Sequence, residues 1–222
     1  MDAQNCETGV LFLDELPEYR RDVLEALRQP MEDGFVTITR VSAQSTYPSS
    51  FMLICSMNPC PCGNYGSRTQ ACRCSQAEIR RYLNRVSGPL LDRIDIQCEI
   101  QPVPFDQLSQ GAPGESSSAI RERVVAARAI QAERFKDTPG VYCNAQMSSK
   151  MLRRYCVLDD ASMRLLRTAM DRYDMSARAY DRILRVARTI ADLHACPDIL
   201  PGHIREAISY RALDRSTWGT TF

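Results

Sequence analysis

The sequence predicts an α/β part followed by an all-α part, and three observations support this division. Two apolar runs, at 10–14 and 51–57, lead into polar residues, as buried parallel strands do where they reach the edge of a sheet. Beyond residue 118 the apolar residues recur at helical spacing instead. Between the two parts lies a stretch rich in Pro, Gly, Ser and Gln, which is typical of a linker.

The α/β part contains the elements of a small sheet and its connections. Buried strands are expected at 10–14, 51–57 and 94–100. Helices are expected at about 20–32 and 76–85, and a strand pair at 35–40 and 45–47. Residues 35–40 alternate between apolar and polar, which predicts the first strand of a hairpin. Ser75 and Glu78 have the spacing of a capping box, which predicts the start of the second helix.

The all-α part predicts a small helical bundle. Its helices are expected at about 119–136, 149–155, 160–173, 177–194 and 202–213. The last three are spaced as in a bundle with short connections. We therefore expect an α/β domain over residues 1–104, a linker over 105–118 and a helical domain over 119–222.

Composition indicates a soluble globular chain, with 44% hydrophobic residues and a formal net charge of +1. No apolar run approaches the roughly 18 residues of a membrane span, and the first residues lack a signal peptide pattern. We therefore expect a cytoplasmic protein without a membrane partner. The nearly neutral charge does not by itself indicate a nucleic-acid binder.

The adjacent carboxylates Asp14 and Glu15 at the end of the first run are the leading catalytic candidates. Acids at the carboxyl end of a parallel strand lie where open α/β sheets bind ligands. In a nucleotide-hydrolysing protein, the first acid would hold Mg²⁺ and the second would polarise the attacking water. The alternative is a strand that simply stops at a charged turn. No G-x-x-x-x-G-K-[ST] phosphate loop occurs in the sequence.

Four of the ten cysteines form two C-x-C pairs separated by nine residues. These are Cys60, Cys62, Cys72 and Cys74. In a reducing compartment such a cluster favours a metal over disulfides, and four thiolates suit a structural Zn²⁺. The alternative is a set of reduced, unligated thiols in a surface loop.

Several long strings resemble one family. GVLFLDELPEYRRDVLEALRQPMEDG, SMNPCPCG, RYLNRVSGPLLDRIDI and SARAYDRILRVARTIADL are similar to the magnesium-chelatase-like AAA+ ATPases of the YifB/ComM family. The resemblance covers nearly the whole chain and implies the C-terminal part of such a protein, without its Walker A segment. The implied fold class is α/β plus all-α: a partial AAA+ parallel sheet, with strands 3, 4 and 5 of the order 5-1-4-3-2, and a C-terminal helical lid bundle.

The resemblance also implies a role for each polar residue that matches a family motif. Asp14 and Glu15 match the Walker B pair, with Asp14 on the Mg²⁺ that accompanies ATP. Asn58 matches sensor 1, which positions the attacking water. Arg93 matches the arginine finger offered to a neighbouring subunit, and Arg178 matches sensor 2, which contacts nucleotide from the lid.

Each of these residues also has an ordinary structural interpretation. Asn58 would then cap a turn, and Arg93 would pair with Asp92 or Asp95. Arg85 is a second candidate for contact with a neighbouring subunit, although a structural role fits it as well.

For function, the resemblance implies a hexameric ring that drives DNA branch migration in natural transformation with ATP and Mg²⁺. The hairpin at 35–48 would face the ring pore, with Arg40 as a DNA phosphate contact or, alternatively, a solvated turn residue. The alternative interpretations are a chelatase subunit that inserts Mg²⁺ into porphyrin and a non-catalytic module that binds DNA or a partner. Because strands 1 and 2 and the phosphate loop are not in the sequence, we expect this chain alone to bind ATP poorly and not to hydrolyse it.

Overall fold

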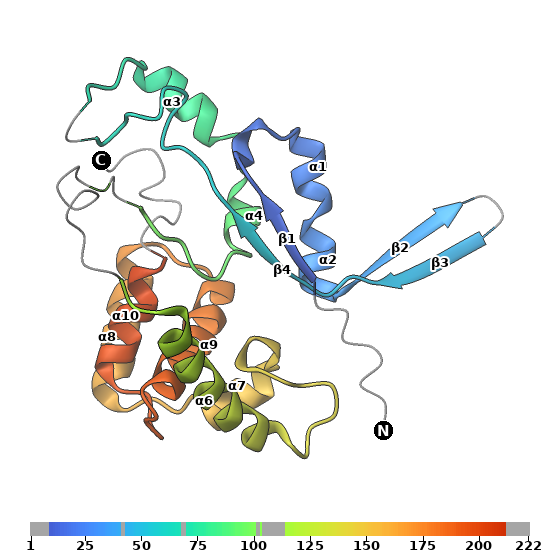
Figure 1. The fold of residues 1–222 in the computed structure, drawn as a ribbon, viewed down its shortest axis with the longest axis vertical. Helices are drawn as coiled ribbons and strands as arrows, with labels where there is room; N and C mark the ends of the chain where they lie inside the picture. Colours follow the sequence, from blue (N-terminus) through green and yellow to red (C-terminus); the bar gives the residue numbers. More distant parts are fainter. Residues whose placement is uncertain (1–8, 41–42, 68–69, 101–102, 104–113, 212–222) are drawn as a thin grey trace. The chain divides into compact units, whose positions relative to one another are not determined.

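The computed structural model describes residues 9–40, 43–67, 70–100, 103 and 114–211 (Figure 1). These fall into two compact units that divide after Ile94, and each is described by itself. This division comes earlier than the boundary expected at residue 104, and the assignment of domains as folding units stays a prediction.

Unit 1, which ends at Ile94, is a mixed α/β unit. Its strands are β1 (Gly9–Leu13), β2 (Phe35–Arg40), β3 (Ala43–Pro48) and β4 (Phe51–Cys55). Its helices are η1 (Leu16–Glu18), α1 (Arg21–Ala26), α2 (Arg28–Asp33), α3 (Gln76–Leu83) and α4 (Gly88–Leu91). The helix expected at 20–32 is thus interrupted: α1 ends at Ala26, Leu27 caps it, and α2 begins at Arg28.

The strands β1 and β4 form a two-stranded parallel sheet, as expected for the first two apolar runs. Their register runs from Gly9 opposite Phe51 to Leu13 opposite Cys55. The third strand expected at 94–100 is not formed, although the structure describes all of these residues. A strand needs a neighbour for its backbone hydrogen bonds. Here the Gln97 N–H donates to the Tyr210 carbonyl at 2.8 Å instead, and the segment pairs with no strand among the described residues.

One face of this parallel sheet is buried and the other is not. On the buried side, Leu13 and Cys55 pack against a core formed by Leu16, Leu24, Val86, Leu90 and Leu91. On the other side four large apolar side chains are 43–60% exposed: Val10, Phe12, Met52 and Ile54. The expectation of strands buried on both faces is therefore wrong for one face. The helices of unit 1 pack their apolar side chains against the buried face only. The four side chains on the exposed face are therefore left uncovered.

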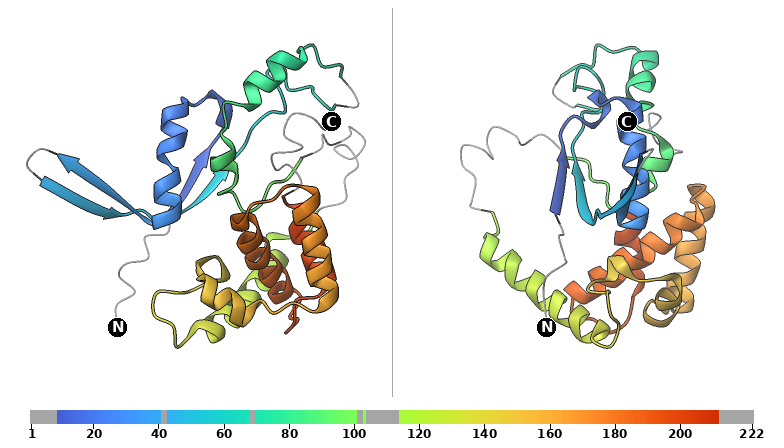
Figure 2. Two further views of the ribbon diagram at one scale, coloured as in Figure 1. Left: turned by 180° about the vertical axis from the view of Figure 1, so that it is seen from behind. Right: turned by 90° about the vertical axis from the view of Figure 1, so that its right-hand side faces the viewer.

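The strands β2 and β3 form the expected antiparallel hairpin, with Phe35 opposite Pro48 and Arg40 opposite Ala43. Figures 1 and 2 show it projecting away from the parallel sheet of unit 1. Most of its side chains are exposed, and the facing hydroxyls of Thr37 and Thr46 lie 3.0 Å apart. Cross-strand pairs of this kind, rather than a core, hold the hairpin together.

Unit 2, which begins at Asp95, is helical. Its helices are α6 (Ser117–Phe135), η2 (Asn144–Gln146), α7 (Ser149–Tyr155), α8 (Asp160–Arg172), α9 (Ala177–Leu193) and α10 (Pro201–Ser209). Four begin at side-chain caps, namely Ser116, Ser148, Asp159 and Ser176. The helix α9 lies at the centre of the core, with Ile183, Leu184 and Ala187 all nearly or fully buried. The expected bundle is therefore present.

A buried polar network fixes α9 to α6 and η2. The carboxylate of Asp192 is fully buried and accepts hydrogen bonds from Arg134, Arg188 and the Asn144 side chain. Buried charges are tolerated when they are paired and hydrogen-bonded in this way. Among the described residues, no helix combines the length and apolar character needed to cross a membrane.

Candidate functional site

The carboxyl ends of β1 and β4 meet at Asp14 and Ser56. The Ser56 N–H donates to the Leu13 carbonyl at 3.0 Å, and the Leu16 N–H donates to the Ser56 carbonyl at 2.9 Å. These bonds carry the pairing of the two strands beyond their last residues. The Ser56 hydroxyl donates to the Asp14 carboxylate, which also accepts the Glu15 N–H at 3.1 Å. Asp14 is therefore held in one orientation at the edge of the sheet.

Glu15 follows in a strained conformation. Its φ and ψ are 51° and 53°, in the left-handed region that non-glycine residues rarely adopt. Strain of this kind persists where the surrounding structure enforces it, and it concentrates at functional sites. The Glu15 carboxylate is exposed and makes no hydrogen bond or ion pair with any other residue that the structure describes. It is therefore available to bind a water molecule.

Asn58 lies just beyond the end of β4, with its side chain exposed. The hydroxyl of Tyr82, a buried residue of α3, lies beside the backbone of Asn58. Burial raises the pKa of Tyr82, and the charges of Glu18 and Glu15 act in the same direction. Tyr82 therefore stays protonated and connects α3 to the loop that carries Asn58. Asp14, Glu15 and Asn58 thus belong to one edge of one unit.

Arg93 lies inside unit 1 rather than on its surface. It is 6% exposed, and it makes an ion pair with Glu32 and donates to the Pro89 carbonyl at 2.7 Å. The pairing with Asp92 or Asp95 that the sequence left open is not the one that forms. In this arrangement the guanidinium is occupied within its own unit.

Arg178 and Arg40 occupy two other places. Arg178 is exposed on the first turn of α9 in unit 2. Arg40 is exposed at the end of β2, near the tip of the hairpin. Neither residue is brought next to Asp14 by the contacts within its own unit.

Two residues of the candidate site were not predicted from the sequence. Ser56 positions Asp14, and Tyr82 supports the loop of Asn58. The only signal for Ser56 is that it directly follows the second strand, so that parallel pairing brings it level with Asp14. Tyr82 gives no comparable signal, because its role depends on how α3 packs.

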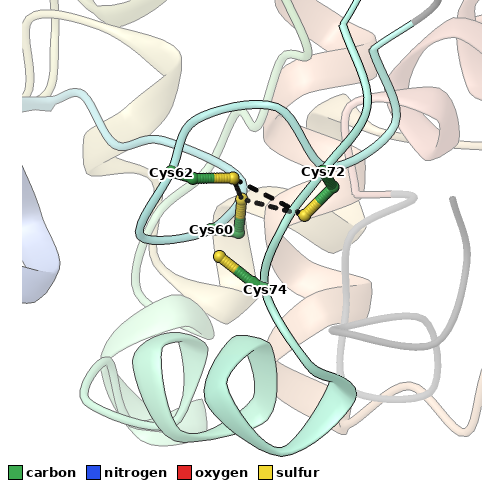
Figure 3. A group of neighbouring side chains, drawn as sticks. All are labelled: Cys60, Cys62, Cys72 and Cys74. Carbon is green, nitrogen blue, oxygen red and sulfur yellow. Dashed lines mark hydrogen bonds between the residues drawn. The ribbon is translucent and has the colours of Figure 1, made fainter.

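The four predicted cysteine ligands converge in the loop between β4 and α3. Figure 3 shows their sulfur atoms pointing toward one another. All four sulfurs lie within 4.8 Å of one another. The Sγ atom of Cys60 is 3.4 Å from that of Cys62 and 3.7 Å from that of Cys72, and the sulfurs of Cys62 and Cys72 are 3.6 Å apart.

These distances fit a tetrahedral metal. A Zn–S bond is about 2.3 Å, so the sulfurs of a regular tetrathiolate site are about 3.8 Å apart. Backbone hydrogen bonds, chiefly to Arg73 and Asn64, lower the pKa of Cys62 to about 6, whereas loss of solvation raises the pKa of Cys74 to about 12 while no metal is bound. Bonds of this kind stabilise an anionic sulfur and orient a metal ligand. The four residues can therefore hold a metal ion.

The loop has little else to hold it in place. Cys60 is fully buried against Ile79 and Leu83 of α3, while Cys62 is exposed. Gly63 and Gly66 both have positive φ values, 77° and 78°, which favour glycine. A bound metal would stabilise this loop, because the loop contributes few apolar side chains to a core.

Two family models match consecutive parts of the chain. Residues 2–108 match the model described as magnesium chelatase, subunit ChlI. Residues 114–211 match the model of the C-terminal part of the same subunit. Together these two models account for both units.

Curated relatives match 93–95% of the chain. YifB of Salmonella typhimurium is 45% identical over 211 residues, which are 95% of this chain and 40% of that protein. The competence protein ComM of Haemophilus influenzae is 45% identical over 208 residues, 93% of this chain and 40% of that protein. YifB of Escherichia coli is 44% identical over 95% of this chain and 40% of its own length. The chain spans about 40% of the length of these relatives.

Proposed function

Because this chain belongs to the magnesium-chelatase-like family that includes YifB and ComM, we propose that it forms the metal- and water-binding side of an ATP-hydrolysis site. The observation that carries the proposal is the meeting of Asp14 and Ser56 at the ends of two adjacent parallel strands. Ligands of open α/β sheets bind at that edge.

Each residue at this edge suits one task. Asp14, oriented by the Ser56 hydroxyl, would hold Mg²⁺, which supplies positive charge to the phosphates of ATP. Glu15, exposed and without a protein partner among the described residues, would polarise the attacking water. Asn58 would place that water, with its loop supported by Tyr82. The family also implies Arg178 as a further nucleotide contact.

Arg93 would act on the nucleotide of a neighbouring subunit in a hexameric ring. Since Glu32 holds its guanidinium now, this role requires Arg93 to exchange the Glu32 carboxylate for phosphate. Arginine suits such an exchange because it binds both anions through the same planar donors. The pair with Glu32 would then keep the finger neutralised until a ring forms.

We propose DNA as the partner on which the ring acts in the cytoplasm. One of the relatives is named as a competence protein, and the exposed hairpin β2–β3 carries Arg40 at its end. The porphyrin alternative, insertion of Mg²⁺ by a chelatase, is favoured by the names of the matching family models. A porphyrin metallation assay on the purified full-length protein would distinguish a porphyrin substrate from DNA.

We also propose Zn²⁺ as the ion of the four-cysteine cluster. The support is a set of four cysteine sulfurs at tetrathiolate spacing, with backbone hydrogen bonds directed at Cys62. Its role would be structural, because all four ligand positions are taken by cysteines and none is left for substrate.

The test uses a chimaera, because the chain lacks a phosphate loop of its own. In the chimaera, this chain replaces the aligned 208-residue segment of Haemophilus influenzae ComM, and the parent protein is measured alongside. We expect the chimaera to hydrolyse ATP and Glu15→Gln to reduce the rate at least 100-fold, as for a residue that acts on the attacking water. Glu122→Gln, the same change at an exposed position of α6, is the control.

Two results would count against the proposal. One is a chimaera whose hydrolysis survives Glu15→Gln. The other is hydrolysis by this chain alone, since we expect the isolated chain to bind ATP weakly and to leave it intact.

A further inference from the structure

A basic hollow lies beside the candidate site, within unit 1. It has a volume of about 450 Å³ and is formed where the segment after η1 meets the C-terminal end of α3. Its charged and aromatic lining consists of Glu18, Tyr19, Arg20, Arg21, Arg81 and Arg85. Four of these lining residues are arginines and one is an acid.

Two of the four arginines are already neutralised. Arg85 makes an ion pair with Glu18 at 3.0 Å and also donates to the Pro17 carbonyl at 3.1 Å. Arg20 makes an ion pair with Asp22 at 2.7 Å. These two arginines consequently form the walls of the hollow rather than a free positive charge.

The other two, Arg21 and Arg81, are available. Both side chains are exposed, and neither makes a hydrogen bond or an ion pair with another residue that the structure describes. The acids Glu25, for Arg21, and Glu78, for Arg81, act on them only by longer-range attraction. They reach the hollow from different elements, Arg21 from the first turn of α1 and Arg81 from α3. Two exposed arginines that line one hollow attract an anion, and their planar donors suit phosphate oxygens.

Tyr19 distinguishes between anions. Tyr19 lines the hollow and is 38% exposed. An aromatic ring beside arginines is the combination that binds single-stranded nucleic acid, since bases stack on the ring while phosphates meet the guanidiniums. The acidic side chains of a protein segment have no aromatic face that could stack on this ring.

We propose that this hollow binds a single-stranded segment of nucleic acid, with phosphates on Arg21 and Arg81 and a base on Tyr19. The inference rests on the proposed DNA-directed function and adds a second contact surface to the hairpin. This surface lies close in sequence to the candidate site, because Tyr19 follows the catalytic candidate Glu15 by only four residues. A nucleic-acid strand bound there would contact the residues next to η1, the short segment that follows the strained backbone of Glu15.

The test is binding of a fluorescent 20-nucleotide oligothymidylate to the full chain, followed by anisotropy over a range of salt concentrations. The double variant Arg21→Gln/Arg81→Gln should weaken binding at least tenfold. The slope of log K against log salt should become shallower by about 1.4, since each lost phosphate contact on a single strand contributes about 0.7. Tyr19→Ala should weaken binding about fivefold or more and leave that slope unchanged.

Arg164→Gln/Arg167→Gln is the matched control, because it removes two exposed arginines from α8 in unit 2. It should bind as the wild type does. Unfolding midpoints measured on every variant show whether each remains folded.

Three results would overturn the inference. The first is equal oligonucleotide binding by the wild type and the Arg21/Arg81 variant. The second is competition by pyrophosphate at the hollow without any effect of the variant on the oligonucleotide, which would mean a small-anion site. The third is a change in self-association alone, which would mean a protein occupant. If the chimaera hydrolyses ATP while one of these results is obtained, nucleic-acid binding at the hollow is ruled out and the proposed ATP-hydrolysis function is retained.

Discussion

The hydroxyl of Ser56 donates a hydrogen bond to the carboxylate of Asp14, and so joins the ends of two strands that are 42 residues apart in the sequence. The contact depends on the parallel register, in which Leu13 lies opposite Cys55 and the following residues come level. It leaves Asp14 with a fixed orientation and Glu15 with a free carboxylate. One hydroxyl thus determines how the acid pair is presented.

Removing that hydroxyl should slow the proposed reaction without abolishing it. In the ComM chimaera, Ser56→Ala should reduce the ATP-hydrolysis rate roughly fivefold, because about 1 kcal/mol of positioning is lost. It should also raise the Mg²⁺ concentration that gives half the maximal rate. Ser56→Thr keeps a hydroxyl and should retain most of the rate. Equal rates for the alanine variant and the parent chimaera would remove Ser56 from the site.

The cysteine cluster predicts a metal content. The purified chain should contain about one zinc per molecule by elemental mass spectrometry, and Cys60→Ser should lose most of it. Cys98→Ser is the control, since Cys98 is an exposed free cysteine outside the cluster. A strong chelator should expose Cys62 and Cys72 to alkylation. Unchanged alkylation rates and no bound zinc would mean that the four thiols are unligated.

The buried carboxylate of Asp192 predicts an acid-sensitive unit 2. Burial raises the pKa of Asp192, but hydrogen bonds from Arg134 and Asn144 and the nearby guanidiniums outweigh it, so the pKa is lowered below 3.8. A lowered carboxyl pKa stabilises the fold above the unfolded-state pKa. This stability is therefore lost as pH falls below about 4.

Asp192→Asn should reduce the free energy of unfolding by about 3 kcal/mol or more, because it leaves two buried guanidiniums without their anion. Urea unfolding at pH 7 measures this loss. Asp198→Asn, at an exposed position, should change it little. A loss below about 1 kcal/mol for Asp192→Asn would show that the network contributes little to stability.

His203 predicts a second pH dependence, closer to neutrality. Burial and then the neighbouring His194 lower the pKa of His203 below 6.5, and its Nδ1 atom accepts the Leu200 N–H at the start of α10. Protonation would remove this acceptor. Because the folded-state pKa is lowered, this part of the free energy of unfolding is present above about pH 6.5 and should be lost as pH falls below it.

His203→Gln keeps a side-chain acceptor for the Leu200 N–H at the third position of α10 and does not titrate. Urea unfolding between pH 5.5 and 7.5 should therefore give a smaller slope for this variant than for the wild type. His194→Gln changes an exposed histidine and should keep most of the slope. An identical slope for His203→Gln would assign the pH dependence elsewhere.

Local pattern was enough to predict most elements and the cysteine cluster. Periodicity and capping residues act within a few positions, and so the helices of unit 2 and the capping box of Ser75 and Glu78 follow from the sequence. The cysteines of the two C-x-C pairs are close in sequence, and a short loop can bring them together. The same locality explains the prediction of the hairpin β2–β3.

Tertiary structure alone decided what each strand and arginine meets. The segment 94–100 has the composition of a strand, but strand formation requires a hydrogen-bonding neighbour that local sequence does not specify. Arg93 pairs with Glu32 rather than with the adjacent aspartates, because packing of α4 buries it beside α2. The Ser56–Asp14 contact likewise joins residues that are distant in sequence. Arg21 and Arg81 are also distant in sequence, and only the fold brings them to the same hollow. Sequence determines local conformation through short-range sterics and hydrogen bonds, whereas the surroundings of a charge depend on how distant elements pack.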